Sequence, residues 1–144
     1  MKIFSSNQIR HIDEYTIINE PVASVDLMER ASGKLFNWYI EHFEKVRPVI
    51  IFAGPGNNGG DGLAMARMLF GKGFSVTVYF AGSPEHASAD WKINRSRLET
   101  ETKVIFETIS ASEFRKSNLL IRFRRGDMGM TKHFLYGLQI RPTI

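Results

Sequence analysis

Apolar positions in the first third of the chain recur at the spacing of amphipathic helices. They fall three or four positions apart, which predicts one helix over residues 6–18 and a longer one over about residues 24–43. Ser6 or Asn7 is expected to cap the first helix and Ser24 the second, because short oxygen-bearing side chains accept hydrogen bonds from the open N–H groups of a first turn. Two helices are therefore predicted before any strand.

The pattern changes to that of a strand at residues 49–53. This uninterrupted apolar run is typical of parallel strands that are covered on both faces. A helix is predicted over about residues 61–72, and a second strand over residues 75–80. Strand, helix and strand in this order form a βαβ unit, whose crossover is right-handed in nearly all proteins.

The remaining pattern repeats this alternation and then loses it. Residues 83–98 predict a helix, and residues 103–106 and 119–121 predict two more strands. After residue 121 neither a helical nor a strand period is present, and residues 141–144 are expected to complete no element. The predicted fold class is α/β, doubly wound around a mostly parallel sheet, with an incomplete C-terminal part.

Composition limits the classes of function. The 144 residues suffice for one domain or part of one, and the lack of cysteine excludes disulfides, thiolate metal sites and a cysteine nucleophile. No apolar run approaches the ~20 residues of a membrane span, and the N-terminus has no signal-peptide pattern. We therefore expect a cytoplasmic protein with no membrane partner.

The formal net charge of +4 comes from the C-terminal end of the chain and not from its body. Residues 1–114 hold 12 Lys and Arg against 14 Asp and Glu, whereas residues 115–144 hold 7 against 1. The basic character is therefore confined to the C-terminal stretch, and nucleic acid is not expected as a partner.

The glycine-rich segment, residues 54–62, carries the most distinctive chemistry. A strand followed by such a turn and a helix start directs backbone N–H groups at an anion. The segment lacks the lysine of a phosphate-binding Walker loop, and residues 80–83 lack the ribose-binding acid of a dehydrogenase. Asn57 and Asn58 either coordinate a cation or only accommodate turn geometry, and Asp61 either binds a ligand hydroxyl or caps the helix.

The glycine-rich segment and the residues around it resemble a known family. With residues 63–69 after it, and with residues 6–13 and 27–31 upstream, it is similar to the YjeF N-terminal domain, the NAD(P)H-hydrate epimerase family. The resemblance covers residues 1–121, as a partial domain, and leaves residues 122–144 as a basic tail outside it. It implies a Rossmann-like three-layer α/β/α fold with two N-terminal helices.

The resemblance also implies an activity. Members are isomerases that interconvert the R and S forms of hydrated NADH and NADPH, in the repair of nicotinamide nucleotides. By resemblance the residues that line the hydrated dinucleotide are Asn57, Asn58, Gly59, Gly60 and Asp61, and Asn58 also supplies an oxygen to a potassium ion. A homodimer is the assembly that the chain could form.

Two positions depart from the family pattern. Arg122 stands where the family has an aspartate implicated in potassium binding and catalysis, and Gly82 stands where some members have a lysine. Arginine stays protonated and cannot act as a base, so the catalytic residue is unknown. Three readings stay open: an epimerase, a non-catalytic nucleotide-binding or scaffold module, and a misfolding-prone fragment of an epimerase.

Overall fold

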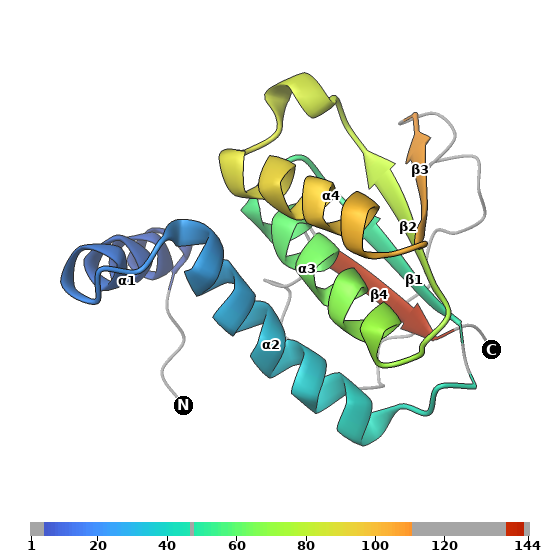
Figure 1. The fold of residues 1–144 in the computed structure, drawn as a ribbon. Coiled ribbons are helices and arrows are strands. Elements are labelled where there is room, and N and C mark those ends of the chain that lie inside the picture. Colours follow the sequence, from blue (N-terminus) through green and yellow to red (C-terminus); the bar gives the residue numbers. More distant parts are fainter. Residues whose placement is uncertain (1–4, 47, 111–137, 143–144) are drawn as a thin grey trace.

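The computed structural model describes residues 5–46, 48–110 and 138–142, and they form helices packed on a sheet (Figure 1). In chain order the elements are α1 (Ser6–Asn19), α2 (Ser24–His42), β1 (Val49–Ala53), α3 (Asn57–Gly71), β2 (Val76–Ala81), the 3-10 turn η1 (Pro84–His86), α4 (Ala89–Glu101), β3 (Ile105–Ile109) and β4 (Leu138–Pro142). The predicted α/β class, with two N-terminal helices before the first strand, is confirmed.

The strands of the described residues form one sheet in the order β3-β2-β1-β4. β1 pairs in parallel with β2, and β2 pairs in parallel with β3. β4 runs antiparallel to β1. The predicted βαβ unit is therefore present, with α3 as the crossover between two adjacent parallel strands.

The core lies between this sheet and α3. The strand positions that face the helices are buried, and so are the facing positions of α3; they are Val49, Ile51, Ala53, Val76, Val78, Phe80, Leu63, Ala66 and Leu69. Trp91 and Leu98 anchor α4 to the same core, and the Phe80 ring centroid lies 4.7 Å from that of Trp91. Burying these side chains supplies the main stabilisation of the fold, since each removes a large apolar surface from water.

α3 is the central helix, and it packs between α2 and α4 over the sheet (Figure 1). α1 lies apart from the sheet and packs against α2, so its apolar residues Ile9 and Ile12 remain about half exposed. No helix among the described residues combines the length and the apolar character that crossing a membrane requires.

The predicted caps of both N-terminal helices are wrong by one or two positions. Ser5 caps α1 in a capping box, in which its hydroxyl accepts from the Gln8 backbone N–H and the Gln8 side chain accepts from the Ser5 backbone. Ala23 precedes α2, and Ser24 is its first residue. The Ser24 hydroxyl instead donates to the Asp90 carboxylate at 2.6 Å, a tertiary bond that local sequence does not reveal.

The helix predicted over residues 83–98 is divided in two. Pro84 begins only the 3-10 turn η1, and α4 begins at Ala89. Ser88 is the stronger start, because its hydroxyl accepts from the Trp91 N–H at 3.2 Å. The Ser88 N–H also donates to the Pro55 carbonyl at 2.9 Å, which ties the start of α4 to the glycine-rich segment.

The expectation that residues 141–144 complete no element is also wrong, because β4 includes Arg141 and Pro142. Ile140 is paired with Ile51 in the register of β4 against β1. The edge of a strand has open N–H and C=O groups, so a segment can pair with it even when its own apolar pattern is weak. This explains why the sequence pattern did not reveal β4. The strand predicted over residues 119–121 lies outside the described residues.

A charged cluster joins the three helices that pack on one another. Arg67 of α3 forms ion pairs with Glu29 of α2 and, at 3.2 Å, with Glu101 of α4. The Arg67 side chain is only 19% exposed, and removing it leaves Glu29 partly buried without its closest cation. We expect Arg67→Met to lower the free energy of unfolding by ~1–2 kcal/mol in a urea titration.

Arg30→Met is the matched control for this prediction. Arg30 pairs with Glu20 at 2.9 Å, but both side chains are more than half exposed. Such a pair contributes less than ~1 kcal/mol, so this variant should unfold close to the wild type. Equal losses in the two variants would show that the Arg67 cluster is no more than a surface pair.

Candidate functional site

The glycine-rich segment begins at the carboxyl end of β1, and most of it is helical. β1 ends at Ala53, and α3 begins at Asn57 rather than at residue 61 as predicted. The first six residues of the helix therefore include three glycines, Gly59, Gly60 and Gly62, all of them buried. Glycine is a poor helix former, which explains why the sequence pattern placed the helix start too late.

Two of these glycines permit close contacts that a side chain would block. A Cβ atom on Gly59 would lie 1.8 Å from the carbonyl oxygen of Gly54. A Cβ atom on Gly60 would lie 2.8 Å from the sulfur of Met28 on α2. The first turn of α3 can therefore lie directly against the end of β1 and against α2.

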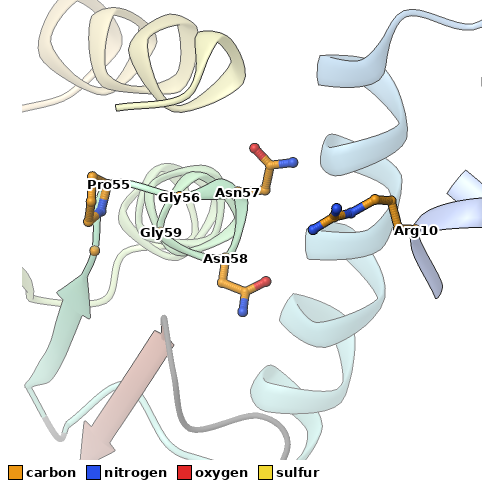
Figure 2. A pocket seen from close by; sticks show the side chains of 7 residues that line it. Arg10, Pro55, Gly56, Asn57, Asn58 and Gly59 are labelled. Atoms are coloured by element: carbon orange, nitrogen blue, oxygen red, sulfur yellow. The ribbon is translucent and has the colours of Figure 1, made fainter. Parts of the chain in front are cut away.

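A pocket of about 390 Å³ opens at this turn, lined by Arg10 and residues 54–59. Figure 2 shows Arg10 extending from α1 toward the start of α3, where Asn57 and Asn58 project on the side that faces it. Of the predicted site residues, Asn57, Asn58 and Gly59 line the pocket. Gly60 and Asp61 lie outside its lining, and their contacts with a ligand remain predictions.

The start of α3 presents unpaired backbone donors to the pocket. Gly56 precedes the helix and offers no side-chain cap, and its carbonyl accepts from the N–H groups of Gly59 and Gly60 at 3.0 and 3.1 Å. Within the described part of the chain, the N–H groups of Asn57 and Asn58 have no acceptor. Open N–H groups at a helix N-terminus favour an anion through hydrogen bonding and the helix dipole.

Asp61 lies one turn into α3 and faces α2. Its carboxylate accepts from the Ser32 hydroxyl at 3.1 Å, and Ser32 is only 2% exposed. Burial raises the pKa of the Asp61 carboxyl from 3.8 to about 6, against the opposing effect of the Ser32 hydrogen bond, and the charges of Asp13 and Asp90 raise the pKa further. The alternative that Asp61 caps the helix is wrong, because Gly56 holds the cap position.

Arg10 could not be singled out from local sequence. It comes from α1, more than 40 positions before the glycine-rich segment, and only the packing of α1 and α2 brings it to the pocket. The one signal was its place in the upstream pattern of residues 6–13. Arg122, the residue at the family's aspartate position, lies outside the described residues.

Comparisons with known proteins give the same family as the one that the glycine-rich segment resembles. Residues 24–125 match the family described as "YjeF-related protein N-terminus". An NAD(P)H-hydrate epimerase of Limosilactobacillus reuteri is 43% identical over 90 residues, which cover 62% of this chain and 42% of that protein. One of Rhodobacter capsulatus is 29% identical over 138 residues, which cover 91% of this chain and 64% of that protein.

A solved structure is also similar. The crystal structure of yeast ynu0 (YNL200c) matches with a TM-score of 0.58 and 27% identity, over 75% of this chain and 47% of that one. The matched region spans less than half of the length of the Limosilactobacillus reuteri relative and of the yeast chain. The family match covers more than half of the present chain. This chain belongs to the YjeF N-terminal domain family.

Proposed function

We propose that the chain acts as an NAD(P)H-hydrate epimerase, interconverting the R and S forms of hydrated NADH and NADPH. The observation that carries the proposal is the pocket at the start of α3. Its lining residues 54–59 lie within the segment, residues 24–125, that matches the family. Relatives that align across this region are named for that activity.

The physical fit to a hydrated dinucleotide rests on what the pocket offers. The open N–H groups of Asn57 and Asn58 suit the phosphate oxygens, and the side-chain amides of the same residues can both donate to and accept from the hydroxylated ring or the ribose. The glycine backbone lets the ligand approach closely, since no side chain projects from Gly54, Gly56 or Gly59.

Potassium is proposed as the ion of this site, with Asn58 as one ligand. Its amide oxygen lies at the pocket, and hard cations of this kind prefer oxygen ligands. Among the described residues no group of three His, Cys, Asp or Glu could hold a metal ion, so Asn58 fits as one member of an oxygen set that other groups must complete. A bound potassium ion would supply positive charge next to the anionic substrate.

Binding without turnover is the second candidate, and Arg122 is the feature that favours it. An arginine at the family's aspartate position removes the acid that the resemblance assigns to catalysis. Its fixed positive charge would also oppose a potassium ion nearby. The pocket itself serves either function, so the two candidates differ only in the presence of turnover.

The test is the rate at which purified protein equilibrates the R and S hydrates of NADPH, measured by chromatography against the spontaneous rate. We expect acceleration by the wild type, and a loss of at least about 10-fold in Asn58→Ala, because one bond to an ion or charged ligand is removed. Asn37→Ala, which removes an exposed asparagine on α2 away from the pocket lining, should retain the wild-type rate.

The outcomes separate the two candidates. Saturable binding of the hydrate that Asn58→Ala weakens, with no acceleration in the wild type, would replace the epimerase with the non-catalytic module. Acceleration that Asn58→Ala and Asn37→Ala reduce equally would show that catalysis takes place away from the pocket.

A further inference from the structure

We infer that Arg10 binds a phosphate group of the dinucleotide and so makes α1 part of the ligand site. This inference rests on the proposed function, because it takes the hydrated dinucleotide as the source of the phosphate. The proposed substrate contacts all come from the glycine-rich segment, whereas Arg10 belongs to a helix that lies apart from the sheet (Figure 1).

Among the described residues that line the pocket, Arg10 alone has a charged side chain. The other six lining residues are glycine, proline and asparagine, which offer backbone groups and neutral amides. The charge that the pocket presents is therefore positive, and it comes from one side chain. A guanidinium group is planar and has five N–H donors, which match the oxygens of a phosphate.

The Arg10 guanidinium is also available for a ligand. The ion pairs of arginine within the described residues involve Arg30, Arg67, Arg95 and Arg97, and Arg10 takes part in none of them. Arg10 is exposed, as a solvated surface arginine would be, but Figure 2 shows it directed at the start of α3. The guanidinium therefore lies on the side of α1 that faces the pocket, where a ligand can reach it.

The start of α3, which lies opposite Arg10, also favours an anion. The open N–H groups of Asn57 and Asn58 lie at the N-terminus of α3, where the helix dipole also favours negative charge. A phosphate between them would receive charge-assisted bonds from Arg10 on one side and backbone bonds on the other. Two segments of the chain would then bind one group, and ligand binding would hold α1 against the body of the fold.

The test uses ADP-ribose, which carries the pyrophosphate of the dinucleotide, and adenosine, which carries no phosphate. In calorimetric titrations Arg10→Gln should weaken ADP-ribose binding by at least about 10-fold, because a bond to a charged group is lost, and should leave adenosine binding unchanged. The salt dependence of ADP-ribose binding should also fall, since one ionic contact is removed. Arg10→Lys should recover part of the affinity, because the charge is restored without the fork of donors.

Arg30→Gln is the matched control, since Arg30 is an exposed arginine outside the pocket lining. It should bind ADP-ribose as the wild type does. Equal losses in Arg10→Gln and Arg30→Gln would overturn the inference, as would equal losses for ADP-ribose and adenosine. Far-UV circular dichroism of each variant confirms that α1 is retained.

A third titration, with inorganic phosphate, identifies the source of the anion. Binding of phosphate as tight as that of ADP-ribose would overturn the assignment to a dinucleotide, whereas much weaker binding supports it. The proposed function fails separately: wild-type protein that binds ADP-ribose through Arg10 and does not equilibrate the hydrates keeps the Arg10 contact and loses the epimerase.

Discussion

Gly59→Ala is expected to destabilise the protein by ~3 kcal/mol or more, because the new methyl group has no space. Its Cβ would lie 1.8 Å from the Gly54 carbonyl oxygen, far inside the contact distance of the two atoms. The obstacle is backbone, and it cannot move aside as the end of a side chain can. Relief requires α3 to shift away from the end of β1, which would also open the pocket. Equilibrium unfolding in urea measures the loss.

Gly56→Ala is the control for this substitution, in the same turn of the same segment. A Cβ atom on Gly56 meets nothing within 4 Å, and its φ of −85° suits alanine. The free energy of unfolding should change by less than ~1 kcal/mol, since alanine also restricts the unfolded chain. Gly60→Ala should fall between the two, because its obstacle is the flexible side chain of Met28. Equal losses at positions 56 and 59 would contradict the close packing of α3 on β1.

The stability of the protein is expected to fall as the pH rises from about 4 to about 6, as a result of Asp61. The Asp61 carboxyl has a pKa of about 6 in the folded protein, above its value of 3.8 in the unfolded chain. Between these values the folded state holds a proton that the unfolded state has released, so a higher pH favours unfolding. A difference of about two pKa units corresponds to at most ~3 kcal/mol, lost across this window and constant above it.

Asp61→Asn should remove this decline and raise the free energy of unfolding at pH 8 by ~1–2 kcal/mol, because the buried charge is gone while an amide oxygen still accepts from Ser32. Ser32→Ala should move the end of the decline to higher pH, since it removes the hydrogen bond that favours the ionised form. The measurement is urea unfolding at several pH values. A decline of equal size in wild type and Asp61→Asn would mean that other carboxyl groups cause it.

The sequence predicted the parts of the fold that depend on local apolar pattern. The run at β1 was long enough to give its bounds, and the alternation that followed gave β2 and the crossover helix. Trp91 and Leu98, the largest apolar residues buried on α4, are 3% and 1% exposed. Each of these elements forms because it buries an apolar face, and the spacing of the apolar residues along the sequence reveals that face.

Features that depend on tertiary contacts could not be predicted in the same way. α3 starts inside the glycine-rich segment because Gly59 and Gly60 fit against Gly54 and Met28, although glycine by itself disfavours a helix. β4 depends on the open edge of β1, and its own pattern is weak. Arg10 reaches the pocket only through the packing of α1 on α2.

An NMR titration with the hydrate of NADPH tests most directly whether the pocket lined by Arg10 and residues 54–59 binds the proposed substrate. The account predicts that the backbone amides of Asn57, Asn58 and Gly59 and the side-chain N–H of Arg10 shift together and saturate. The amides of Phe70 and Gly71, at the opposite end of α3, should keep their positions. Saturable shifts that gather away from the pocket, or no shifts at all, would contradict the account.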